Sequence, residues 1–149
     1  MLNRYRAAFR SFHEHDVRYL VIGGIAAILH GVPRATFDLD ILIEATPENV
    51  KRLLDAFLQA GLGTASLTSP EDVLANEITI FKDRVRIDVQ TATPGIGFGE
   101  AWERRAVMNL SGQDLYVVSK RDLVASRRAA GRATDLEGIR ILELSGEGE

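Results

Sequence analysis

The sequence predicts an α/β (α+β) fold, in which helices pack on a short, mixed β-sheet. Short runs of apolar and β-branched residues, which are typical of strands, recur along the chain. Between them lie segments whose apolar residues repeat at helical spacing, which is typical of amphipathic helices. Because strands and helices alternate irregularly, the sheet is expected to be mixed rather than purely parallel.

Length and composition indicate a single domain over residues 1–149, with the C-terminal helices from about residue 119 included. The chain is 46% hydrophobic and 26% charged, which is ordinary for a globular protein. Cysteine is absent, and this excludes disulfides, thiolate metal ligands and thiol catalysis. The longest apolar stretches are too short to span a membrane, and the N-terminal residues do not resemble a signal peptide. We therefore expect a cytoplasmic protein without membrane contact.

Capping residues mark where several helices begin and end. Thr46 is a candidate N-cap with Pro47 at the first helical position, and Gly61 ends that helix. Ser119 caps a later helix, which Gly131 ends. The expected helices cover 2–13, 25–30, 47–60, 100–105, 120–130 and 135–144, and one helical turn begins at 69–72.

Strands are predicted where apolar residues alternate with polar ones or cluster as β-branched runs. The last four of them should pair as two hairpins. Two segments rich in small or polar residues, 63–70 and 93–99, are expected to be loops, the second of them a flexible connector. The expected strands cover 19–22, 37–44, 77–81, 84–91, 106–110 and 115–118.

The chain is organised around two glycines at the junction between a strand and a helix. Tyr19–Ile22 is an apolar strand that runs directly into Gly23 and Gly24, and a helix-permissive segment follows. A helix start leaves backbone N–H groups without partners, and glycine lets an anion approach without a Cβ in the way. The pattern therefore indicates a site for phosphate.

Two aspartates share one face of the strand that comes next. Side chains alternate across a strand, so Asp38 and Asp40 project side by side, while Leu39 and Ile41 point to the other face. Neighbouring carboxylates repel each other unless a cation lies between them. Mg²⁺ accepts one or two carboxylates and takes further oxygens from substrate phosphates, so the pair is a candidate metal site.

A third carboxylate, Asp88, lies on the polar face of a later predicted strand. Val85, Ile87 and Val89 point to the opposite face of that strand. If the two strands are neighbours in the sheet, Asp88 can complete a metal site with Asp38 and Asp40 and can orient or deprotonate an attacking hydroxyl.

These motifs resemble the nucleotidyltransferase superfamily of the DNA polymerase beta type. The resemblance lies in the Gly23-Gly24 pair, the Asp38-Leu39-Asp40 triplet and the later strand with Asp88. Within the superfamily, residues 17–142 are similar to small bacterial proteins grouped with AbiEii-type toxins and related minimal nucleotidyltransferases.

The resemblance implies transfer of a nucleotidyl group from a nucleoside triphosphate to a hydroxyl, with Mg²⁺, or Mn²⁺ in its place, as cofactor. The implied nucleotide-binding residues are Gly23, Gly24, Arg34, Thr36, Lys120 and Arg127. The sequence departs from the family pattern twice: Gly24 stands where many members have serine, and Arg127 stands where lysine is expected.

Each candidate residue also has a structural interpretation. Asp38 and Asp40 could lie on the wet face of an ordinary strand, and Asp88 could pair with Arg84 or Arg86 on the surface. His30 is better explained as a hydrogen-bonded imidazole than as a catalytic group. The basic segment 119–140 is by default a solvated helix face, although it could also guide a polyanion such as RNA.

Two other classes of function stay open beside the enzyme. One is a degenerate module that binds a nucleotide or a partner protein without catalysis. The other is one half of a toxin–antitoxin pair. The formal net charge of −3 argues against a protein that coats nucleic acid, and the site residues do not distinguish RNA or tRNA, a protein or a small molecule as acceptor.

Overall fold

The computed structural model describes residues 2–33, 38–131 and 133–144, and the side chains of 133–138 fall outside the description. The predicted mixed sheet is confirmed: it has six strands in the order β3-β4-β2-β1-β6-β5. The strands are β1 (Tyr19–Ile22), β2 (Leu39–Ile43), β3 (Ile78–Lys82), β4 (Arg86–Gln90), β5 (Ala106–Leu110) and β6 (Gln113–Val117).

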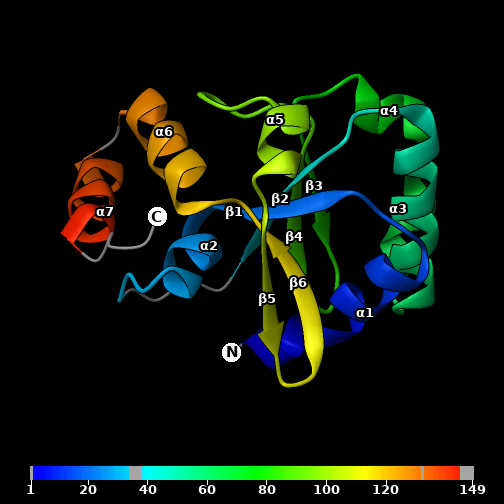
Figure 1. Cartoon of the computed structure of the whole chain (residues 1–149). Coiled ribbons are helices and arrows are strands. Elements are labelled where there is room, and N and C mark those ends of the chain that lie inside the picture. The colour runs from blue at the N-terminus through cyan, green and yellow to red at the C-terminus, as the bar shows by residue number, and fades with distance from the viewer. Residues whose placement is uncertain (1, 34–37, 132, 145–149) are drawn as a thin grey trace.

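Helices pack on this sheet and surround it (Figure 1). Within the described residues, no helix is long and apolar enough to cross a membrane. The helical elements are η1 (Leu2–Tyr5), α1 (Arg6–Glu14), α2 (Gly23–Leu29), α3 (Pro47–Gln59), η2 (Gly63–Leu67), α4 (Pro70–Leu74), α5 (Phe98–Glu103), α6 (Lys120–Ala130) and α7 (Ala133–Leu144).

The central strands run in both directions. β1 is antiparallel to β2 and parallel to β6, whereas β2 is parallel to β4. The two predicted hairpins, β3–β4 and β5–β6, form the two edges of the sheet. Opposed strand directions place the end of β1 beside the start of β2, which is where the glycines meet the aspartates.

The register aligns the candidate site residues in one row across the sheet. Ile22 pairs with Asp40, Asp40 pairs with Asp88, and Asp88 pairs with Ile80 on the terminal strand β3. Residues that are partners in register point to the same face. Asp40 and Asp88 are thus direct neighbours on one face, as the metal hypothesis requires.

Aromatic packing under α1 and α3 holds the opposite face of the sheet. The ring of Phe12 lies 4.8 Å from that of Tyr19 and 5.7 Å from that of Phe57, between ring centroids. Phe57 in turn contacts Phe81 of β3 at 4.7 Å. These fully or nearly fully buried rings stabilise the face of the sheet opposite the aspartates. The aspartate face is therefore not covered by this aromatic packing.

Three sequence expectations need correction. The loop expected at 63–70 contains the 3-10 helix η2. Leu42, on the same face of β2 as Asp40, is buried, so this face is exposed to solvent only near the aspartates. The connector expected to be flexible packs tightly on α6: a Cβ on Gly95, which has a φ of +85°, would lie 2.6 Å from the carbonyl oxygen of Ala125. Glycine at this position therefore allows the loop to pack closely against α6, and it does not make the loop flexible.

Candidate active site

The glycine turn is shaped by its contact with an aspartate. β1 ends at Ile22 and α2 begins at Gly23, which has a φ of +67°. A Cβ on Gly23 would lie 2.6 Å from the carboxylate oxygen Oδ2 of Asp40. Glycine is therefore required here twice, once by the left-handed backbone and once by the carboxylate that packs against it.

Asp40 lies at the centre of the carboxylate cluster, by which we mean Asp38, Asp40 and Asp88. The pKa of Asp40 is raised from 3.8 to about 7, chiefly by burial and then by the charges of Asp88 and Asp38 and a side-chain hydrogen bond with Asp88, while Arg86 opposes the shift. Negative charge is crowded at this point of the sheet. A cation would relieve that crowding.

Arg86 supplies a positive charge to the carboxylate cluster. Its Nε and Nη2 donate to Asp88 Oδ1 and Oδ2 at 2.9 and 3.2 Å, and the same Nε lies 3.8 Å from Asp38 Oδ2. The structural interpretation of Asp88 is thus correct in part: it does pair with Arg86. Arg84 does not take part, because its Nη2 donates to the carbonyl oxygen of Ala60 at 2.7 Å.

The donor set of the cluster fits a hard divalent cation through two of its carboxylates. Among the described residues, no group of three or more acidic or histidine side chains is placed to hold a metal ion directly. Asp40 and Asp88 are nevertheless direct partners in register, and Mg²⁺ needs only one or two protein carboxylates when substrate phosphates supply other oxygens. Asp38 is joined to them through Arg86.

Arg127 reaches the glycine turn from the far end of the sequence. This residue of α6 is 5% exposed, and its Nη2 donates to the carbonyl oxygen of Gly23 at 3.5 Å. Gly24 follows in the first turn of α2. The predicted nucleotide-binding residues Gly23, Gly24 and Arg127 are therefore brought together.

Of the other three predicted nucleotide-binding residues, only Lys120 lies within the described residues, and it lines a different part of the molecule. Lys120 is the first residue of α6 and lines an open cavity of about 540 Å³, with Arg121 and Arg128 from α6 and Leu142 from α7 among its neighbours. Arg34 and Thr36 lie outside the described residues.

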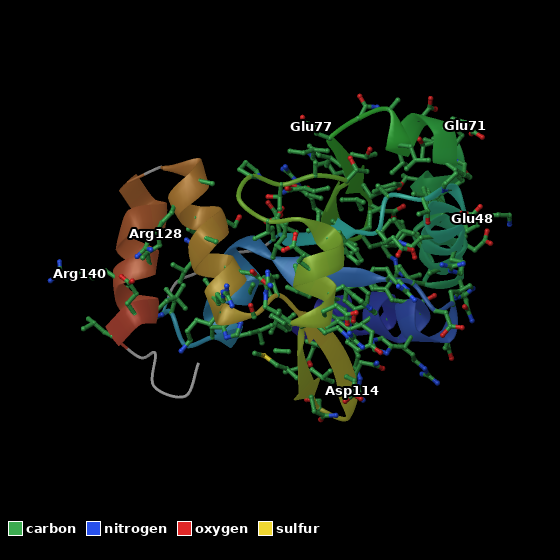
Figure 2. All side chains as sticks on the ribbon, turned by 45° about the horizontal axis from the view of Figure 1, so that its top comes forward. Glu48, Glu71, Glu77, Asp114, Arg128 and Arg140 are labelled. Atoms are coloured by element: carbon green, nitrogen blue, oxygen red, sulfur yellow. The ribbon has the colours of Figure 1, made fainter. Side chains whose placement is uncertain are left out.

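The basic segment near the C-terminus has an ion pair that offsets part of its charge: Arg128 pairs with Glu143 at 2.7 Å. Asp122, a buried acidic residue of the segment, is held by Arg104 from outside it, through two hydrogen bonds of 2.9 and 3.0 Å. In Figure 2, Arg128 and Arg140 lie on the side of α6 and α7, away from three labelled acidic residues, Glu48, Glu71 and Glu77.

His30 has the structural role that the sequence favoured. Its Nε2 lies 2.8 Å from the carbonyl oxygen of Val118, and this contact ties the end of α2 to the chain just before α6. The bond fixes α2 relative to α6, and with it the turn that Arg127 contacts.

Fold and site together define the class of the protein. A mixed sheet with a glycine turn at the end of β1 and carboxylates on the next two strands on one side, β2 and β4, is a nucleotidyltransferase fold. The sequence model of a family described as nucleotidyltransferase of unknown function (DUF6036) matches residues 6–147, and the chain belongs to this family. No curated protein matches the chain.

Proposed function

We propose that the protein transfers a nucleoside monophosphate from a nucleoside triphosphate to a hydroxyl group, in a reaction that depends on Mg²⁺ or Mn²⁺. The observation that carries the proposal is the position of Asp40, whose carboxylate packs against Gly23 and whose partner in register on β4 is Asp88. Phosphate and metal would meet there. Membership of the nucleotidyltransferase family supports the reaction class.

The residues of the cluster take different roles in this proposal. Asp38, Asp40 and Asp88 would hold the metal, which when bound would neutralise the phosphates and the attacking and leaving oxygens. Asp88 lies on β4, next to the edge strand β3, so we assign to it the role of orienting the acceptor hydroxyl and accepting its proton.

The triphosphate is held by the glycine turn and by cationic side chains. Gly23 and Gly24 leave room for its oxygens at the end of β1. Arg127, already at this turn, would neutralise its charge together with Lys120 and Arg34, and the Thr36 hydroxyl would donate a hydrogen bond to it.

The acceptor and the biological setting are further parts of the proposal. A hydroxyl can come from RNA such as tRNA, from a protein or from a small molecule. The resemblance of residues 17–142 to AbiEii-type proteins supports a place in a toxin–antitoxin pair, with a cognate partner protein and a cytoplasmic location.

A second candidate is a module that binds a nucleotide or a partner without catalysis. The observation that favours it is the contact of Arg86 with Asp88 and Asp38, whose single positive charge already offsets part of the negative charge that a metal would offset. The two candidates differ in whether Asp88 is needed for chemistry.

Labelled nucleoside triphosphates, incubated with Mg²⁺ and cell lysate, test the proposal. We expect the wild type to label one acceptor and Asp88→Asn to label it about a hundredfold less. The exposed Asp114→Asn on β6 is the matched control and should label as the wild type does.

Thermal unfolding with triphosphate and Mg²⁺ measures binding in the same proteins. Because a ligand of the folded state stabilises it by mass action, the melting temperature should rise in the wild type and in Asp88→Asn. A rise without labelling by the wild type would support the binding module instead. No rise with any triphosphate and no labelling would refute the transferase and the nucleotide-binding form of the second candidate, and would leave only a module that binds a partner protein.

A further inference from the structure

We propose that Arg86 is an internal counter-ion that competes with the divalent cation for Asp88. In the metal-free protein its guanidinium offsets part of the negative charge of the carboxylate cluster, and it has to release Asp88 when the cation binds. The inference rests on the proposed function, because it concerns the regulation of the same site.

The geometry of the contact is that of a strong but replaceable ion pair. Both oxygens of Asp88 accept from the guanidinium, which is the fork arrangement that arginine forms with carboxylates. The Asp88 side chain is 16% exposed and the Arg86 side chain 39%. The carboxylate is therefore fixed in the sheet, whereas the guanidinium can turn into solvent without unpacking the core.

The position of the guanidinium makes the two cations exclude each other. The Nε atom of Arg86 lies 2.9 Å from Asp88 and 3.8 Å from Asp38, so it occupies space between two of the three candidate ligands. A divalent cation on the same carboxylates would lie close to this positive charge and be repelled by it.

The backbone of Arg86 is held in place by contacts that do not involve its side chain. Tyr5 donates a hydrogen bond from its hydroxyl to the carbonyl oxygen of Arg86 at 3.1 Å, and Arg86 pairs with Lys82 across the β3–β4 hairpin. Release of Asp88 therefore needs only rotation of the Arg86 side chain, with β4 and its carboxylate unchanged.

Binding of Mn²⁺, measured by electron paramagnetic resonance of the free ion, tests the inference without reference to turnover. We expect Arg86→Gln to bind Mn²⁺ about tenfold more tightly than the wild type, because a repelling charge is removed. Arg84→Gln is the matched control: it removes the same charge from a residue of the same hairpin that contacts Ala60 instead, and it should bind as the wild type does.

A second measurement separates a counter-ion from a merely structural residue. Without metal, Arg86→Gln should melt at a lower temperature than the wild type, because the carboxylates lose their partner, and saturating Mn²⁺ should close this difference. If Arg86→Gln does not fold, Arg86→Lys replaces it: lysine keeps the charge but not the fork, and several-fold tighter Mn²⁺ binding is expected.

Weaker or unchanged Mn²⁺ binding by the arginine variants would overturn the inference, since Arg86 would then orient Asp88 for the metal or have no effect on it. In that case the proposed function would stand, provided that the wild type binds Mn²⁺. Absence of Mn²⁺ binding in every variant and in the wild type, with triphosphate present, would overturn the inference and the proposed metal dependence together.

Discussion

Asp40→Asn is expected to lower the rate of nucleotidyl transfer about a thousandfold or more, because it removes the central charged oxygen of the carboxylate cluster. The amide has nearly the same shape as the carboxylate, so the contacts with Gly23 and Asp88 can persist. Loss of activity should therefore occur in a folded protein. Initial rates with the labelled acceptor and a far-ultraviolet circular dichroism spectrum measure the two properties.

The same variant should change how the stability of the metal-free protein depends on pH. The pKa of Asp40 is raised from 3.8 to about 7 on folding, so the folded state binds a proton that the unfolded state has lost between these pH values. The free energy of unfolding of the wild type thus falls as the pH rises from about 4 to about 7. The amide introduced by Asp40→Asn cannot ionise, and this contribution is absent from the variant.

Chemical denaturation at pH 4 and pH 8 in the presence of a chelator measures this effect. At pH 8, Asp40→Asn should be more stable than the wild type by about 1–3 kcal/mol, and at pH 4 the two should be nearly equal. Asp114→Asn, at an exposed position, serves as control. A variant that is less stable than the wild type at pH 8 would show that Asp40 is a structural residue.

Gly23→Ala is the second substitution with a large expected effect. The new Cβ would lie 2.6 Å from Asp40 Oδ2, and the φ of +67° is unfavourable for alanine. The left-handed backbone alone costs about 1–2 kcal/mol, and the carboxylate has to move in addition. We expect a loss of stability beyond that figure and a loss of transfer comparable with that of Asp40→Asn.

Gly112→Ala provides a control for the backbone cost by itself. Gly112 has a φ of +86° in the β5–β6 turn, and a Cβ added there would have nothing within 4 Å. Denaturation should show a smaller loss for Gly112→Ala than for Gly23→Ala, and transfer should be unaffected. Equal losses of stability, with activity retained in both, would mean that Gly23 has no role in placing Asp40.

Much of the site could be predicted because its determinants are local. Alternation along a strand puts Asp38 and Asp40 on one face, and a helix cap depends on only a few neighbouring residues. The Thr46 and Ser119 caps are confirmed by hydrogen bonds from the N–H groups of Asn49 and Asp122. The same alternation predicted that Asp88 lies on the polar face of its strand. The register in the structure then shows that its partner is Asp40.

The rest of the site depends on contacts between distant segments, which no local pattern specifies. Arg127 meets Gly23 only because α6 packs beside α2, and Gly95 is fixed only because α6 lies against its loop. The bond between Arg86 and Asp88 was one of two pairings that strand alternation allowed. The other pairing, between Arg84 and Asp88, is excluded only by the tertiary contact of Arg84 with Ala60.

The terminal position of β3 has a consequence for the behaviour of the protein in concentrated solution. Ile78 and Ile80 are each 52% exposed on this strand, and its outer edge carries backbone groups ready to pair with another strand. Two molecules that meet along this edge can continue the hydrogen-bonded ladder and cover their isoleucines. Charged side chains at a strand edge limit such growth because they lose water in the contact, and exposed Glu77 and Lys82 lie at the two ends of this strand.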